Sequence, residues 1–313
     1  MAVTVYRWDD ASAPVLSASN GALIGVLDAC LVDGYGAKAA AGWSKAFSGT
    51  NKAAYLQGTG GNGHYLRVDN STSNQYPRWR GYEAMSDVDT GTGPFPTDAQ
   101  VSGGLYLSTS STNDSTARPW LIAADAKRFY LWIGYNDTTS TGLGSTAYKP
   151  IFFYGNILPL RPADAYHTLI VANASGAANV NNLGTIGLAG AAIAGHYLAR
   201  INNQTGTSLA CSKASDQRAE SHLILGTAAI TYPDPITGGM LLAPVFVIEP
   251  TTFLTRGIMP GLWNPLHALP GNPGDVFAGT ATGGLTGKSL ILLDCAAAST
   301  RGRAALETSD TWE

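Results

Sequence analysis

Apolar residues follow a helical period in one stretch of the chain, close to its beginning. They recur at the i, i+3, i+4, i+7 and i+8 spacing that places side chains on one face of a helix. The positions are Leu23, Val26, Leu27, Cys30 and Leu31. Ser19 or Asn20 is placed to cap the first turn, and Gly34 to end the last, because glycine adopts the left-handed conformation that follows many helices. The pattern predicts one short amphipathic helix near residues 20–33, packed against a sheet.

Most of the remaining chain is typical of β-strands separated by turns. Short runs rich in aromatic and β-branched residues alternate with segments rich in Gly, Ser, Thr, Asn and Asp, which favour turns. The predicted strands are residues 43–47, 52–57, 65–69, 78–85, 104–108, 120–124, 129–135, 151–155, 223–225, 241–247 and 289–293. This regular spacing favours a mainly β, sandwich-like fold over alternating strands and helices.

The domain organisation is less sharply marked than the strands. A provisional cut near residue 155 divides the chain into an N-terminal β-rich domain, 1–155, which carries the helix, and a C-terminal β-rich domain, 156–313. The segment 136–147 is rich in Thr, Ser and Gly and suits a long hairpin loop as well as a boundary. A single elaborated domain is the alternative.

Charged residues are scarce for a chain of this length. Asp, Glu, Lys and Arg make up 13% of the 313 residues, which is about half of the share usual in globular proteins. The centres of protein interfaces are depleted in charge and enriched in aromatic residues. We therefore interpret the composition as that of an assembly subunit whose faces are covered by other protein, including copies of itself.

Several classes of protein are disfavoured by the same composition. The net charge is −3, and no basic stripe marks a nucleic-acid partner. The apolar stretches are far shorter than the roughly 20 residues of a membrane-spanning helix, and no secretory leader is visible, so we expect synthesis in the cytoplasm and no membrane span. Cys30, Cys211 and Cys295 have neither disulfide-framework nor zinc-site spacing.

Motifs that would indicate catalysis are weak. Glu83, Asp87 and Asp89 form the densest acidic cluster, and paired carboxylates can hydrolyse glycosidic bonds, but a solvated loop edge is by far the more common reason for such a cluster. The glycine-rich segment 58–63 lacks the Lys-Ser/Thr ending of a phosphate loop and predicts a hairpin turn. The five histidines have no metal-ligand spacing. We expect no enzyme activity, no cofactor and no metal.

Aromatic residues are the remaining candidates for a functional surface. Trp79, Trp120, Trp132 and Trp263 supply large rings that suit protein interfaces and sugar binding alike. Filling of the β core is the more common role of such rings, an interface role comes next and a sugar-binding platform last. We treat these four tryptophans as candidate interface or glycan-facing residues.

Several longer segments have sequences that are typical of one protein family. Near the start these are residues 27–50 (LDACLVDGYGAKAAAGWSKAFSGT) and 51–55 (NKAAY). In the middle they are 78–97 (RWRGYEAMSDVDTGTGPFPT) and 118–132 (RPWLIAADAKRFYLW), and towards the end 233–247, 257–267 and 301–312. These segments are distributed from residue 27 to residue 312, and they resemble a family of virion structural proteins from tailed bacteriophages, although none of them is a mechanistic motif.

The resemblance implies a non-enzymatic structural subunit of the virion, at the tail tip or baseplate. Its expected partners are other virion proteins and copies of itself, and its expected location is the virion, after synthesis in the host bacterium. One alternative is a lectin-like module that binds host surface polysaccharide, with Trp79, Trp120 or Trp132 lining an exposed groove. Others are a head decoration or fibre-anchoring protein, and a depolymerase that uses Glu83 with Asp87 or Asp89.

Overall fold

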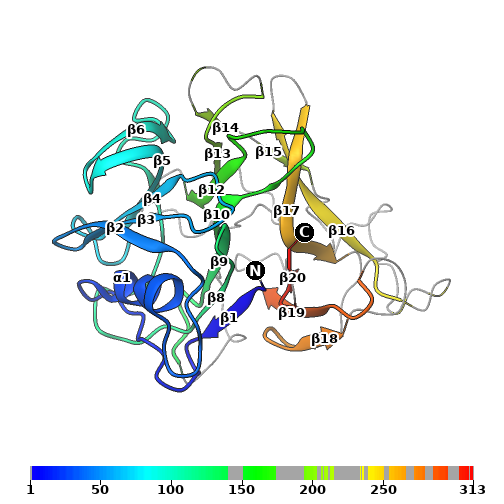
Figure 1. The fold of residues 1–313 in the computed structure, drawn as a ribbon. Coiled ribbons are helices and arrows are strands. Elements are labelled where there is room, and N and C mark those ends of the chain that lie inside the picture. Colours follow the sequence, from blue (N-terminus) through cyan, green and yellow to red (C-terminus); the bar gives the residue numbers. More distant parts are fainter. Residues whose placement is uncertain are drawn as a thin grey trace.

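The computed structural model confirms a mainly β chain with one short helix (Figure 1). It describes residues 2–139, 151–173, 194–202, 206, 208–210, 212–214, 233, 235, 239–249, 254–265, 271–278, 285–294, 303–309 and 311–312. Within these ranges all pairs of adjacent strands are antiparallel, as expected for hairpin-connected segments.

The first sheet contains most of the strands. Its order is β1-β8-β9-β10-β12-β7-β5-β4-β3-β2, with β6 beside β5 and with β13 and β14 continuing from β12. The bounds are β1 Thr4–Arg7, β2 Ser44–Gly49, β3 Lys52–Leu56, β4 Tyr65–Asp69, β5 Arg78–Asp87, β6 Thr90–Phe95, β7 Leu105–Tyr106, β8 Trp120–Ala124, β9 Arg128–Ile133, β10 Ile151–Asn156, β12 Thr168–Asn173, β13 Ala194–Leu198 and β14 Leu209–Ala210.

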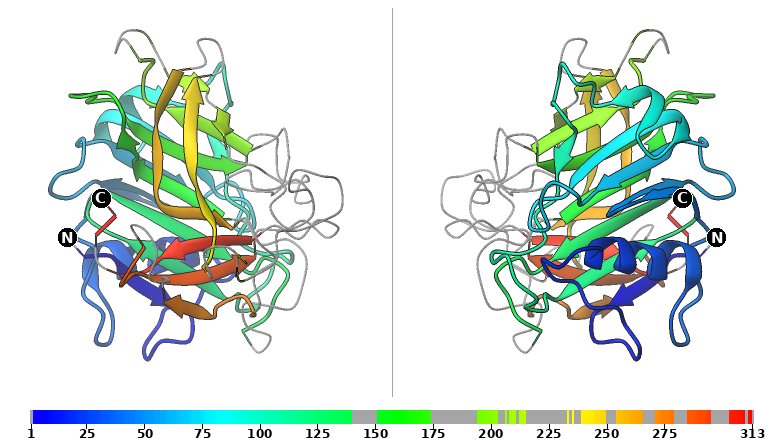
Figure 2. Two further views of the ribbon diagram at one scale, coloured as in Figure 1. Left: turned by 90° about the vertical axis from the view of Figure 1, so that its right-hand side faces the viewer. Right: turned by 90° about the vertical axis from the view of Figure 1, so that its left-hand side faces the viewer.

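The second sheet is built from the later part of the chain. Its order is β15-β16-β17-β20-β19-β18, and β11 pairs with β17. The bounds are β11 Leu158–Pro159, β15 Ser212–Ala214, β16 Leu242–Glu249, β17 Leu254–Pro265, β18 Val276–Ala278, β19 Ser289–Asp294 and β20 Arg303–Glu307. Figure 2 shows the molecule from two sides, with this sheet in front in one view and the helix in front in the other.

Strands β8, β9 and β10 form the middle layer of the molecule. Every residue in them is buried, and successive side chains enter two different cores. On β9, for example, Phe129 and Leu131 pack with the helix and strands β3–β5, whereas Tyr130 and Trp132 pack against the second sheet. This is the two-residue period of a strand covered on both faces, and it explains why these strands are hydrophobic at nearly every position, with Arg128 and Asn156 as buried polar exceptions at their ends. The sandwich-like prediction is confirmed.

The predicted helix forms, but its cap differs from the prediction. Helix α1, Ala22–Leu27, continues into a π-helical turn, Asp28–Asp33, and all five predicted apolar positions are buried. Gly21 occupies the N-cap and no side chain caps it, so the expectation of a Ser19 or Asn20 cap is wrong. Gly34 follows with φ 78° and ψ 169°, a conformation open to glycine almost alone. A Cβ there would lie 2.6 Å from the carbonyl oxygen of Lys38.

The other strand predictions vary in accuracy. The predicted strands at 65–69 and 120–124 have the observed bounds, and several others differ by one or two residues. The strands that were not predicted are β1, β6, β11, β12, β13, β14, β15, β17, β18 and β20, and the predicted strand at 223–225 lies outside the described residues. The provisional domain boundary at residue 155 falls within β10, which is hydrogen-bonded to β9 on one side and β12 on the other.

Candidate functional site

The outer face of strands β3, β4 and β5 carries a ladder of charged side chains. On β4, Leu66 and Val68 point into the core, so Arg67 and Asp69 point to the opposite face. The strand register sets Lys52 beside Asp69 and Asp69 beside Arg78, and it sets Arg67 beside Arg80. Residues distant in sequence therefore meet on one surface because the strands are paired in this register.

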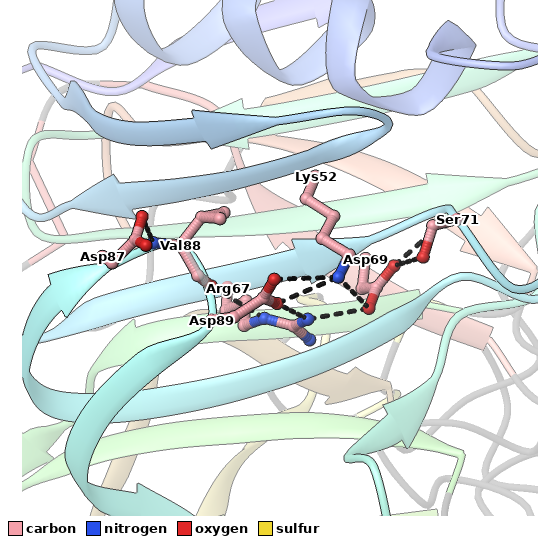
Figure 3. Close-up of polar contacts among 7 residues, drawn as sticks. All are labelled: Lys52, Arg67, Asp69, Ser71, Asp87, Val88 and Asp89. Atoms are coloured by element: carbon pink, nitrogen blue, oxygen red, sulfur yellow. Dashed lines mark hydrogen bonds and ion pairs between the residues drawn. The ribbon is translucent and has the colours of Figure 1, made fainter.

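Two cations and two carboxylates form one half of this ladder (Figure 3). Lys52 Nζ lies 2.9 Å from Asp89 and 3.8 Å from Asp69, and Arg67 Nη2 lies 2.7 Å from Asp69 and also contacts Asp89. Asp69 Oδ1 additionally accepts hydrogen bonds from the backbone N–H of Ser71 at 2.9 Å and from its hydroxyl at 2.5 Å. Hydrogen bonds from Arg67 and Lys52 lower the pKa of Asp89. The carboxylates therefore stay ionised in mildly acidic solution.

Arg78 forms the other half of the ladder together with Arg80. Its Nη1 donates to the carbonyl oxygens of Ser102 at 3.1 Å and Gly104 at 2.9 Å, and its Nη2 donates to the hydroxyl of Tyr106. The guanidinium also lies over the Tyr106 ring, 3.4 Å from its centroid. No carboxylate of the described chain forms an ion pair with Arg78. Burial, opposed in part by Tyr106, lowers the pKa of Arg78, and the charge of Arg80 acts in the same direction as burial.

Arg80 is more deeply buried than Arg78. Only 6% of its surface is exposed, and its Nη2 donates to Asp98 at 2.6 Å and to the carbonyl oxygen of Val101 at 2.9 Å. Its Nε is buried and has no hydrogen-bond partner among the described residues. Asp98 is itself 73% exposed, so water already solvates this carboxylate and the ion pair with Arg80 stabilises its charge only a little further.

These side chains surround an open pocket of about 450 Å³. It is lined by Arg67, Asp69, Thr72, Arg78, Arg80, Tyr82, Asp89, Asp98, Ser102 and Gly103. Three arginines and three aspartates thus face one volume, and Tyr82 is the one aromatic residue among them. The pocket offers strong hydrogen-bond donors beside strong acceptors.

Three of the four candidate tryptophans do not reach the surface. Trp79, Trp120 and Trp132 are each 0% exposed, so the hypothesis that they line an exposed groove is wrong. Trp263 is half-buried on β17, between Pro244 and Ala305. Trp79 lies on the correct strand but faces the core, while its neighbours Arg78 and Arg80 face the pocket. The alternation of Arg78, Trp79 and Arg80 along β5 is the sequence signal that places the two arginines on the outer face.

The predicted acidic cluster is dispersed by the fold. Glu83 forms a bidentate pair with Arg200, at 2.6 and 2.5 Å. Asp87 accepts the N–H of Val88, and Asp89 belongs to the ladder (Figure 3). The three carboxylates therefore contact three different sets of partners in the structure.

A second arginine cluster is buried between the two sheets. Arg256, on β17, donates to Asp164 at 2.5 and 3.2 Å, to Glu249 at 2.7 Å and to the carbonyl oxygen of Arg200 at 2.8 Å. Asp164 belongs to the connection between β11 and β12, and Arg200 follows β13. The cluster thus joins the second sheet to the edge of the first.

A network of neutral polar side chains lies close to this junction. His64 Nδ1 and Thr168 Oγ1 are 2.8 Å apart, and Thr168 donates to Asn156 at 3.1 Å. The His64 ring stacks on Tyr166, which in turn lies beneath Arg200, 4.2 Å from its guanidinium. Burial lowers the pKa of His64 to about 4, so the ring is neutral at neutral pH.

The remaining candidate groups give no further site. Gly60 and Gly63 have positive φ in the turn between β3 and β4, which confirms the predicted turn at 58–63. Cys30 is buried and reduced, and Cys211 and Cys295 lie outside the described residues. Within the described ranges no group of His, Cys, Asp and Glu could hold a metal ion. No helix there is long and apolar enough to cross a membrane.

No family model matches the chain, and no curated protein matches it in sequence.

Proposed function

We propose that this chain is a non-enzymatic structural subunit of a tailed-bacteriophage virion. It belongs at the tail tip or baseplate, where it assembles with copies of itself and with other virion proteins. The observation that carries the proposal is that the few charged side chains are mostly paired with opposite charges, outside the pocket as well as in it. Lys45 pairs with Asp28 at 2.7 Å, Arg7 with Asp9 at 2.8 Å and Lys288 with Glu307 at 2.8 Å.

Paired charges change what it costs to cover a surface. An unpaired ion that loses its water is strongly destabilised. For an ion that already has a partner, the attraction to that partner offsets part of the desolvation penalty. A face on which a sparse set of charges is mostly paired can therefore be covered by another protein at lower cost. Interface centres are depleted in charge for the same reason.

Exposed apolar side chains supply the attractive part of such a contact. The large exposed hydrophobic residues of the described chain are Val15, Leu160, Leu254 and Val276. Leu160 follows β11 and donates its N–H to the carbonyl oxygen of Arg256, two residues beyond Leu254. Leu160 and Leu254 therefore lie on neighbouring segments at the margin of the second sheet, which is the contact surface that we expect to be covered.

The layered core suits a load-bearing subunit. The middle strands β8–β10 are buried on both faces, and the hydroxyl of Tyr130 on β9 donates to the carbonyl oxygen of Pro260 on β17 at 2.8 Å. Such a core holds the two sheets in one arrangement. A subunit with this property can transmit force without repacking.

The oligomeric state of the purified full chain tests the proposal. In sedimentation velocity we expect concentration-dependent oligomers, and we expect the chain to co-purify with particles from the host that encodes it. Changing both Leu160 and Leu254 to Glu should shift the equilibrium towards monomer. Val15→Glu is the matched control, because Val15 is 61% exposed but lies between β1 and α1.

A chain that remains monomeric at high concentration and is absent from purified particles would contradict the proposal. A chain found at the head instead of the tail would assign it to head decoration, and one found only at fibre bases would assign it to fibre anchoring.

A further inference from the structure

We propose that the pocket on β4 and β5 binds an acidic saccharide, with the sugar carboxylate at Arg78 and Arg80 and the sugar hydroxyls at Asp69 and Asp89. This inference concerns a site within one chain and does not depend on the assembly role. The volume of about 450 Å³ lies in the range of small-molecule pockets.

The two ends of the pocket differ in charge balance. At one end, Arg67 and Lys52 are shared between Asp69 and Asp89, so cations and carboxylates compensate one another. At the other end, Arg78 forms no ion pair with a carboxylate of the described chain, although Asp69 is its neighbour across the strands, and Arg80 pairs with the largely exposed Asp98. An incoming carboxylate is therefore favoured at the Arg78 end.

The donors at that end are incompletely used. The hydrogen bonds of Arg78 to Ser102, Gly104 and Tyr106 use Nη1 and Nη2, and its planar guanidinium has further N–H groups that can bind a carboxylate in the bidentate manner. Arg80 lines the same pocket while its buried Nε lacks a partner in the described part of the chain. A ligand that reorients this guanidinium by a small amount would satisfy a group that is costly to leave unbonded.

The compensated end selects for hydroxyl groups. A sugar hydroxyl both donates and accepts, so it can bond to an aspartate oxygen and an arginine N–H that lie side by side. Asp89 is half exposed, at 50%, and can meet such a hydroxyl without the ladder being dismantled. Polyanions such as nucleic acids are disfavoured because three carboxylates line the same pocket.

An acidic peptide is the other ligand that carries a carboxylate, and the pocket suits it poorly. Peptide binding depends mainly on apolar anchors seated in desolvated pockets. The lining here is composed of charged and small polar side chains, with Tyr82 only 7% exposed. The hydroxyl-rich ligand therefore matches more of the lining than the peptide does.

Binding to the purified full chain, measured by titration calorimetry or saturation-transfer NMR, tests the inference. The probes are a disaccharide that contains glucuronic acid, the same disaccharide with its carboxylate reduced to an alcohol, and a short oligoglutamate peptide. We expect the acidic disaccharide to bind at least about ten-fold more tightly than either of the other probes.

Variants locate the site. Arg78→Gln should weaken binding of the acidic disaccharide by at least about ten-fold. Arg7→Gln is the matched control, because Arg7 also lies over an aromatic ring, that of Trp8, but on β1. Should Arg78→Gln disturb folding, Thr72→Trp fills the mouth of the pocket from an exposed position and leaves every ion pair intact.

The inference is overturned if the acidic disaccharide does not bind, if its reduced form binds equally well, or if oligoglutamate binds as tightly. It is also overturned if Thr72→Trp, folded as judged by circular dichroism, binds the acidic disaccharide like the unchanged chain.

Discussion

The two arginine clusters of this molecule use the same side chains in opposite surroundings. Arg256 is 1% exposed, and its partners Asp164 and Glu249 are 0% and 4% exposed. In the pocket, by contrast, Asp89 is 50% exposed and Asp98 is 73% exposed. One cluster is sealed between two sheets, and the other opens to water.

This difference in burial separates a structural role from a binding role. When one member of a buried cluster is removed, the remaining charge has neither water nor partner, and the native state is strongly destabilised. When one member of an exposed pair is removed, water replaces it. The pocket charges are therefore available to a ligand in a way that those around Arg256 are not.

The largest effect should follow from Arg256→Met. The change leaves Asp164 and Glu249 as two buried carboxylates without their shared cation, which should cost about 3–5 kcal/mol of the free energy of unfolding. Urea denaturation at neutral pH measures it. A loss below about 1 kcal/mol would show that burial does not distinguish the two clusters.

The next effect is a loss of stability in acid that depends on His64. Its pKa is lowered from 6.5 to about 4, mainly by burial, so the unfolded chain binds a proton more readily than the native chain between these values. The contribution of the neutral His64 ring to the free energy of unfolding is fully present above pH 6.5. It is lost as the pH falls towards about 4, and the total loss is about 3 kcal/mol.

The variant His64→Phe isolates this contribution, because it keeps a ring beside Phe95 and Tyr166 but cannot be protonated. Unfolding free energies at neutral pH and at about pH 4.5 should differ less in the variant than in the unchanged chain. Equal acid losses in the two proteins would refute the role of His64. His167 also has a lowered pKa, mainly through burial, so part of the acid sensitivity should remain.

A smaller effect should come from the pair that lies between the two extremes. The side chains of Arg200 and Glu83 are 28% and 16% exposed, and Arg200 also lies over Tyr166. Arg200→Gln should therefore cost about 1–2 kcal/mol. A double-mutant cycle with Glu83→Gln measures the interaction energy between the two side chains. An energy as large as that lost with Arg256 would contradict the expectation that the stabilisation by an ion pair increases with its burial.

The smallest effect should follow from Asp98→Asn in the pocket. Hydrogen bonds from Arg80 and from the N–H of Gly103 lower the pKa of Asp98, yet the residue is largely exposed. The melting temperature should change little, because an asparagine keeps an oxygen that can accept a hydrogen bond from Arg80, and the charge that is lost sits on a largely exposed side chain, where it contributes about 0–1 kcal/mol. A large loss of stability would instead give this edge of the pocket a structural role.

Local patterns were sufficient to predict the helix and the central strands. The apolar spacing in residues 20–33 and the dense aliphatic and aromatic runs of β8–β10 report burial directly. Strand β6 (TGTGPF) and strand β20 (RAALE) have compositions that disfavour strands, and they form because β5 and β19 offer paired backbones. Such pairing depends on the backbone of another strand, so it cannot be predicted from the residues of β6 or β20 alone.

Only part of the pocket could be predicted from the sequence. The alternation in YLRVD and in RWR indicates that Arg67, Asp69, Arg78 and Arg80 share the outer faces of their strands. It does not state that Arg67 lies beside Arg80, which requires the register of β4 and β5, or that Asp98 and Ser102 close the pocket. Trp79 was a candidate for the functional surface because of its large ring, but it lies on the core face of β5, opposite to the pocket.

Electron microscopy of particles from the host that encodes this chain tests the central claim most directly. The account predicts several symmetry-related copies at the tail tip or baseplate, each with the margin around Leu160 and Leu254 covered by a neighbouring protein. Particles in which this chain has no density, together with a purified chain that is monomeric and fully solvated, would contradict it.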